Sequence, residues 1–317
     1  MINSYIALGY TCNHKCINCP LSTFDRLHGE LDKDVIIKNV KELSKYKDKL
    51  HITISGGEPT LNPNFFDVLK ILGKSNSYIT ILSNATTCKD EKIVFDIINC
   101  LGTSYDLKRL NYVTAIHSYN RETHDRLTGT LGSFDETIRG LENLSKNNIH
   151  VIIKIIMNKV TTKDILKTID YICSHFKENV SIELCVTDYT GRCGKHIDEL
   201  YINSEDLEPL LEKALDNFEK KKYKNMLKII ETPLCLTDPY YWKYYQIKDN
   251  NELTYIAPNN EKENNISKSI EHNCHTNYLE CNNCDFKKYC SGVWESTYHI
   301  EKNKKKIIRP IKIEKGF

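Results

Sequence analysis

The sequence lacks the features of membrane, secreted and nucleic-acid-binding proteins. None of its 317 residues lies in an apolar run approaching the about 18 positions needed to span a bilayer. The first residues, Met-Ile-Asn-Ser, show neither the positive region nor the apolar region of a signal peptide. A net charge of +2 gives no argument for nucleic acid. Internal repeats, phosphate-binding glycine loops and nucleic-acid motifs are also missing, so we expect neither a membrane nor a nucleic-acid partner.

Cysteine, in contrast, is abundant, with 13 residues in the chain. In a chain without an export signal, many cysteines indicate metal ligands in a reducing compartment more than disulfides. We therefore expect a cytoplasmic protein that holds metal clusters. Its length allows a large core, built as one big domain or as one domain with an appendage.

Three of the cysteines form a compact motif near the N-terminus. Cys12, Cys16 and Cys19 have the spacing C-x3-C-x2-C and follow a strand predicted over residues 5–8. Three thiolates in a short loop can ligate three irons of a cubane cluster and leave the fourth iron open, whereas electron-transfer clusters usually have four cysteines. On spacing alone, a zinc site with one further ligand is an equal alternative.

A second motif follows about 40 residues later. The β-rich run of residues 51–55 ends in Gly56, Gly57, Glu58 and Pro59. Two glycines after a strand allow a tight turn and a close approach to a ligand. Glu58 adds a carboxylate, and Pro59 fixes the exit of the chain.

Together, and in this order, the two motifs resemble those of the radical S-adenosylmethionine (SAM) superfamily. The resemblance implies that Cys12, Cys16 and Cys19 bind a [4Fe–4S] cluster whose open iron is chelated by the amine and carboxylate of SAM. It also implies that the Gly-Gly-Glu-Pro edge hydrogen-bonds that amine. Asn18 stands before the third cysteine, where the family usually has an aromatic residue.

Strand and helix patterns alternate along the first two thirds of the chain. Besides residues 5–8, strands are predicted at 50–55, 78–83, 110–117, 149–157 and 180–186, and helices at 33–46, 64–72, 90–101, 133–147 and 162–176. Asp32 and Ser133 occupy N-cap positions. Continuous apolar strands alternating with helices predict an α/β fold with a parallel sheet. The resemblance implies a partial (β/α)6 barrel over residues 1–200.

Polar residues follow three of these strands and are candidates for contacts to SAM. Functional loops of such folds gather at the C-terminal strand ends. In the family, polar residues here hold the SAM carboxylate, ribose and adenine. Taken singly, each is equally well explained as a strand-end cap or a solvated loop residue. The candidates are Ser83, Asn84, His117, Ser118, Lys154 and Asn158.

A cysteine follows the sixth strand in the segment Gly191-Arg192-Cys193-Gly194. Family members with auxiliary clusters often have Gly-Arg-Ala here, facing the site. Cys193 is thus a catalytic candidate, a thiol that donates a hydrogen atom to a substrate radical. The alternative is an ordinary buried thiol. Cys185, inside the strand, is a weaker candidate for the same role.

The second cysteine group is C-terminal. Cys281, Cys284 and Cys290 have the spacing C-x2-C-x5-C, with zinc as the alternative metal. The segment resembles the SPASM and twitch extensions, which bind auxiliary [4Fe–4S] clusters. Its fourth ligand is Cys235 or Cys274, and Pro-x-Cys favours Cys235. Because Trp294 stands where a full pattern has another cysteine, we expect one auxiliary cluster in a short extension.

These assignments predict three regions and a reaction. We expect the barrel at 1–200, a bridging helix region at 201–230 and the extension at 231–317. The resemblance implies a 5′-deoxyadenosyl radical that abstracts hydrogen from a substrate C–H bond, with flavodoxin or ferredoxin as an external one-electron reductant. The leading substrate is a ribosomally made peptide, which would be crosslinked, oxidised or epimerised, although only eleven residues precede Cys12 and leave no room there for a leader-binding domain.

Two alternatives stay open. One is a twitch-type dehydrogenase or epimerase that acts on a small molecule. The other, from a different class, is a non-catalytic iron–sulfur electron carrier or sensor. The carrier would need a fourth protein ligand at the first cluster, and SAM binding would exclude it.

Overall fold

The computed structural model describes residues 1–21, 29–176, 178–247, 253–256, 267–268, 275–301 and 309–312. Cys274, one of the two candidates for the fourth auxiliary ligand, lies outside these residues. Within the described part of the chain, no helix is both long enough and apolar enough to cross a membrane.

Nine of the described strands form one large curved sheet in the order β7-β6-β5-β4-β3-β2-β1-β8-β9. Their bounds are β1 Ile2–Ala7, β2 Leu50–Ser55, β3 Tyr78–Leu82, β4 Leu110–Ala115, β5 His150–Met157, β6 Val180–Val186, β7 Leu227–Ile230, β8 Leu253–Ile256 and β9 Ser267–Lys268. Neighbouring strands are parallel except for the antiparallel pair β8 and β9. The order is linear from β7 to β9, so the sheet is an open, partial barrel, as predicted.

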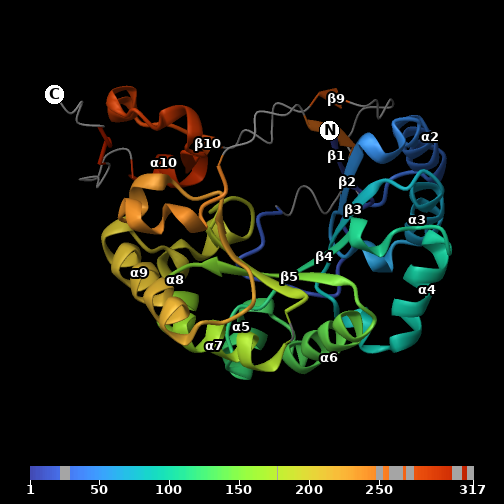
Figure 1. The fold of residues 1–317 in the computed structure, drawn as a ribbon, viewed down its shortest axis with the longest axis horizontal. Helices are drawn as coiled ribbons and strands as arrows, with labels where there is room; N and C mark the ends of the chain where they lie inside the picture. Colours follow the sequence, from blue (N-terminus) through green and yellow to red (C-terminus); the bar gives the residue numbers. More distant parts are fainter. Residues whose placement is uncertain are drawn as a thin grey trace.

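Helices cover the outer face of this sheet in an arc (Figure 1). They are α2 Lys33–Ser44, α3 Phe65–Lys74, α4 Glu91–Leu101, α5 Arg121–Thr128, α6 Ser133–Lys146, α7 Ile165–His175 and α9 Ser204–Lys221. In β5, side chains 151, 153, 155 and 157 are buried while the alternate ones are partly exposed. This period of two shows that the strand's fully apolar face packs against the helices, while its other face turns to the barrel interior.

Helix α5 and strands β7, β8 and β9 were not predicted. Helix α5 is short and polar, with only His124, Leu127 and Thr128 buried. Strand β7 lies inside the region expected to be a bridging helix, and it extends the sheet beside β6. Strands β8 and β9 lie in the region expected to form the C-terminal extension, yet β8 pairs with β1 and β9 pairs with β8.

The predicted N-cap Asp32 accepts hydrogen bonds from the backbone of Asp34 and Val35, as expected. The predicted cap at Ser133 is wrong, because Gly132 is the N-cap of α6. The carboxylate of Asp125 on α5 accepts the nearby N–H groups of Gly132 and Phe134 instead. A cap supplied by another helix leaves no local sequence signal.

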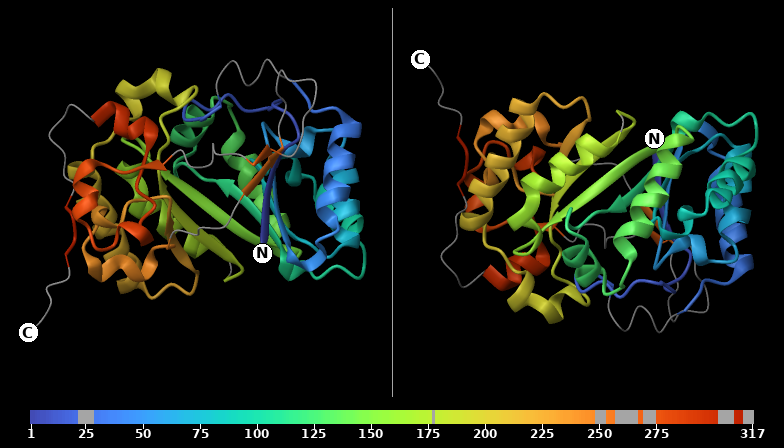
Figure 2. Two further views of the ribbon diagram at one scale, coloured as in Figure 1. Left: turned by 90° about the horizontal axis from the view of Figure 1, so that it is seen from above. Right: turned by 90° about the horizontal axis from the view of Figure 1, so that it is seen from below.

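The C-terminal elements lie on the side of the barrel opposite α2, α3 and α4 (Figure 2). They include the antiparallel pair β10 His275–Thr276 and β11 Val293–Trp294, and the helix α10 Glu295–Glu301. The indole Nε1 of Trp294 donates to the carbonyl of Val186 at 3.1 Å. Ser296 donates to Asp188 at 2.7 Å. The described C-terminal elements thus contact the C-terminal end of β6.

Candidate active site

The loop that carries Cys12, Cys16 and Cys19 leaves β1 and is held from both sides by backbone hydrogen bonds. On one side, Lys15 N–H donates to the carbonyl of Thr128, and Ile17 N–H donates to that of Leu127 at the end of α5. On the other side, the segment after β2 donates to the backbone of residues 9 and 11. These bonds fix a loop that has no regular secondary structure of its own.

Gly56 and Gly57 make the contact on the β2 side possible. A Cβ on Gly57 would lie 2.2 Å from the carbonyl oxygen of Thr11, and one on Gly56 would lie 2.1 Å from that of Gly9. Gly56 also has a φ of 126°, which disfavours other residues. The two glycines therefore let the backbone approach the cysteine loop itself, and Gly57 lines the adjacent cavity as well.

Glu58 is buried and acts as a connector. Its Oε1 accepts from the hydroxyl and N–H of Thr60 and from the hydroxyl of Ser83, at 2.6, 3.1 and 2.8 Å. Its Oε2 accepts from the N–H of Asn84 at 2.7 Å. Burial raises the pKa of Glu58, and these hydrogen bonds oppose the shift. The carboxylate thus joins the C-terminal ends of β2 and β3.

Glu58→Ala is expected to lower the free energy of unfolding by about 3 kcal/mol, because it leaves several buried donors without an acceptor. Denaturant titration measures the loss. The matched control Glu42→Ala removes an exposed glutamate paired with Lys45, and it should change stability by less than about 0.5 kcal/mol. Equal stability of the two variants would contradict the connector role.

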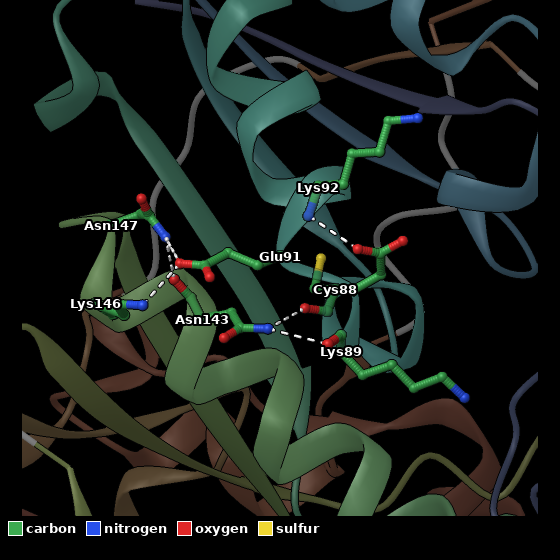
Figure 3. Close-up of polar contacts among 8 residues, drawn as sticks. Cys88, Lys89, Glu91, Lys92, Asn143, Lys146 and Asn147 are labelled. Carbon is green, nitrogen blue, oxygen red and sulfur yellow. Dashed lines mark hydrogen bonds and ion pairs between the residues drawn. The ribbon is translucent and has the colours of Figure 1, made fainter.

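Hydrogen bonds from α6 hold the segment after Asn84 in place (Figure 3). The amide of Asn143 donates to the carbonyls of Cys88 and Lys89 at 2.9 and 3.1 Å. Lys146 and Asn147 reach the carboxylate of Glu91 on α4 at 3.0 and 3.4 Å. These contacts hold the segment that follows the end of β3.

A cavity of about 270 Å³ opens at the C-terminal ends of the central strands. Six residues predicted to bind the cluster or SAM line it: Cys16, Gly57, Ser83, Asn84, His117 and Lys154. These side chains come from the cysteine loop and from the ends of β2, β3, β4 and β5. Convergent polar groups at the strand ends of a parallel sheet are typical of a cofactor site.

Other predicted contacts lie outside the cavity lining. Ser118 accepts the N–H of Asn120 at 3.1 Å, and Asn158 accepts those of Val160 and Thr161 at 2.9 and 3.0 Å. Both therefore cap local turns. Gly56, Glu58 and Pro59 shape the same region without lining the cavity.

The lining also includes polar residues that the sequence analysis missed: His14, Ser55, Thr114, His124, Thr128 and Thr137. Burial lowers the pKa of both His117 and His124 to about 3, so both rings are neutral at pH 7. The ring centroids of these two histidines lie 5.4 Å apart. His124 does not follow a predicted strand, and His14 lies within the cysteine loop, where only the cysteines were considered as ligands.

Lys154 lines the cavity and also contacts a carboxylate on the neighbouring strand. Its ammonium lies 3.9 Å from the carboxylate of Glu183 on β6. Burial alone would lower the pKa of Lys154, but Glu231, Cys185 and Glu183 raise it. The lysine is therefore charged, and it is available to fix a polar group at the ends of β5 and β6.

The thiol of Cys193 is fully buried in a small apolar cluster with Leu127, Val160, Tyr189 and Leu200. Its N–H donates to the carbonyl of Cys19 at 3.1 Å. It does not line the cavity. Its role as a hydrogen donor stays a prediction, and its position beside the cysteine loop is also that of a packing residue.

The cysteine loop fits an iron–sulfur cluster in its donor chemistry. Burial, and then the charges of Cys19 and Cys12, raise the pKa of Cys16 to about 12, which shows that the three sulfurs are neighbours. A bound cation relieves this repulsion between thiolates. Among the described residues, no three His, Cys, Asp or Glu side chains are already arranged as a metal site.

Four C-terminal cysteines meet around a second, small cavity of about 20 Å³. Cys235, Cys281, Cys284 and Cys290 all line it. Burial raises the pKa of Cys235 to about 12, and the charges of the other three cysteines add to the shift. The N–H groups of Leu234 and Gly292 donate to the sulfur of Cys290 at 3.3 and 3.4 Å, a contact common at ligating sulfurs.

The family model described as the radical SAM superfamily matches residues 6–172, which span both motifs and the lined cavity. The chain belongs to the radical SAM superfamily. Membership implies a [4Fe–4S] cluster and SAM, and the cysteine loop and the cavity beside it are the parts of this chain that fit them.

Its relatives within the radical SAM superfamily are distant. The chain is 28% identical over 160 residues to an AdoMet-dependent heme synthase of Methanosarcina barkeri, covering 50% of this chain and 43% of that protein. It is 27% identical over 138 residues to the mycofactocin maturase MftC of Mycobacterium tuberculosis, covering 44% and 33%. The matches thus span less than half the length of these curated relatives.

The fold is similar to that of Streptococcus suis SuiB bound to its precursor peptide SuiA. The TM-score is 0.67 and the identity 17%, covering 95% of this chain and 73% of SuiB. The likeness therefore extends beyond the barrel into the C-terminal elements.

Proposed function

We propose that this chain is a radical SAM enzyme that abstracts hydrogen from a C–H bond of a ribosomally made peptide and leaves it crosslinked, oxidised or epimerised. The observation that carries the proposal is the cysteine loop held against Gly56 and Gly57 beside a donor-lined cavity. When bound, the reduced cluster and SAM supply the 5′-deoxyadenosyl radical. Cys12, Cys16 and Cys19 would hold the cluster, and the strand-end residues would orient SAM.

The chain's own residues have three tasks in this reaction. The hydrogen bonds of Glu58 hold the ends of β2 and β3 in register, so the polar groups that orient SAM stay in place. The apolar part of the cavity lining, with Leu82, Val113 and Ile156, excludes water from a reactive radical. Lys154 supplies a fixed positive charge for a polar group of SAM.

The peptide class is supported by the maturase MftC among the relatives and by the fold shared with peptide-bound SuiB. A short SPASM- or twitch-like extension would add one auxiliary [4Fe–4S] cluster on Cys235, Cys281, Cys284 and Cys290, able to accept the electron left on an oxidised substrate. Flavodoxin or ferredoxin in a reducing cytoplasm would supply the first electron.

Turnover in D2O tests this function and separates its outcomes. We expect anaerobically reconstituted, dithionite-reduced protein to form 5′-deoxyadenosine from SAM, and a short peptide encoded beside this chain to change mass in its presence. Loss of two hydrogens means oxidation or a crosslink, and gain of one deuterium means epimerisation. SAM cleavage without any peptide change would favour a small-molecule substrate. SAM bound but never cleaved would overturn the enzyme assignment.

A further inference from the structure

Two histidines line the cavity with ring nitrogens that have no hydrogen-bond partner. His14 lies between Cys12 and Cys16 and is 4% exposed, and His124 lies on α5 and is 1% exposed. In the part of the chain that the structure describes, neither Nε2 atom meets a donor or an acceptor. Leaving such a group buried and unpaired is unfavourable. A bound ligand would remove that cost.

The tautomer of His124 follows from its other nitrogen. The N–H of His117 donates to Nδ1 of His124 at 3.3 Å, so this nitrogen carries a lone pair. Since the ring is neutral, its proton is on Nε2. His124 therefore offers the cavity a hydrogen-bond donor.

The rest of the lining shows which ligand group suits this donor. Among the described residues, the cavity lining includes no aspartate or glutamate, and Lys154 is its only lysine or arginine. The hydroxyls of Thr128 and Thr137 stand in the same lining, but they already donate to the carbonyls of Asp125 and Asn84 at 3.0 and 3.1 Å. A described lining with an unused imidazole donor, one positive charge and no carboxylate is complementary to an anionic group.

We propose that His14 and His124 bind the carboxylate of SAM's methionine part through their Nε2 atoms. The position of His14 inside the cysteine loop selects this end of SAM, because the methionine part is the end that meets the open iron. This inference rests on the proposed function and assigns two further binding residues to the same site.

Two substitutions of His124 distinguish the roles of its two ring nitrogens, Nδ1 and Nε2. Asparagine places an acceptor near the position of Nδ1 and keeps the bond from His117, but it has nothing at Nε2. Glutamine places an N–H donor near Nε2. By calorimetry without reductant, H124N is expected to bind SAM about tenfold more weakly than wild type, and H124Q to lose less than about threefold.

Binding of 5′-methylthioadenosine, which has the purine and ribose but no carboxylate, should be the same in all three proteins. The control H51N changes a histidine that pairs with Thr80 on the strands and does not line the cavity, and it should bind SAM like wild type. H14L tests the same site from the cysteine loop, and it replaces H124N if that variant does not fold.

Three results would overturn the inference. In the first, H124N binds SAM as tightly as wild type. In the second, H124N weakens SAM and 5′-methylthioadenosine equally, which would place His124 at the purine. In the third, H124Q fails as badly as H124N. If wild type itself does not bind SAM, the proposed function fails first and this assignment fails with it.

Discussion

Changing Cys12, Cys16 and Cys19 together to alanine is expected to abolish the formation of 5′-deoxyadenosine from SAM. The three thiols are the candidate ligands in the loop, and alanine cannot bind iron. Liquid chromatography of anaerobic reactions with dithionite measures the product. The same protein should still bind iron at its C-terminal cysteines, because these line a separate cavity.

The matched control replaces three other cysteines that line neither cavity, Cys88, Cys100 and Cys173. Because Cys88 is buried, it is replaced by serine or valine. This substitution tests whether a change in packing alone lowers SAM cleavage. This control should keep SAM cleavage within a fewfold of wild type. Product formation by the Cys12, Cys16 and Cys19 variant would show that the cluster lies elsewhere.

The sequence was most informative where a single element carries its own signal. Strands β2 and β6 lie at the predicted residues 50–55 and 180–186. Each is an apolar, β-branched run flanked by turn residues, which is enough to define a buried parallel strand. The helices α4 and α6 likewise begin and end within about one residue of their prediction, since N-terminal acids and apolar periodicity define them.

Elements were missed where tertiary contacts decide the structure. The four residues of β7, Leu-Lys-Ile-Ile, are too few to show a period and become a strand because β6 pairs with them. Helix α5 reads as polar, and it is held by the cysteine loop and by its own link to α6 through Asp125. The local sequences of β7 and α5 therefore give no sign of these contacts.

The residues of the site also fall into those that a local sequence signal predicts and those that only tertiary contacts bring to the site. Residues at strand ends, such as Ser83, His117 and Lys154, were predicted because parallel strands bring their ends to one edge. His14 and His124 lie 110 positions apart, and only the folded chain brings both to the cavity. Glu58 was identified as part of the site, yet its function as a connector between β2 and β3 depends on donors 25 and 26 residues away.

Cys235→Ala is expected to lower the iron content from about eight to about four per chain, since each cubane holds four irons. Cys235 lies 46 residues before Cys281, yet its thiol lines the same small cavity as Cys281, Cys284 and Cys290. Loss of one of four ligands should release or destabilise the auxiliary cluster while the N-terminal loop keeps its own. Iron analysis and the visible absorbance of the clusters measure the loss, which should be on the order of one half.

The comparison that decides the fourth ligand is Cys274→Ala, which should keep about eight irons if Cys235 is the ligand. Cys173→Ala on α7 controls for the loss of any thiol and should also keep them. The opposite pattern, with iron lost in Cys274→Ala and kept in Cys235→Ala, would reassign the ligand. Metal analysis that finds about four irons and one zinc in wild type would instead assign the four C-terminal thiolates to a structural zinc site, because the same donor set suits both metals. The radical chemistry would then have no auxiliary electron acceptor, and a redox-neutral outcome would be favoured over oxidation of the peptide.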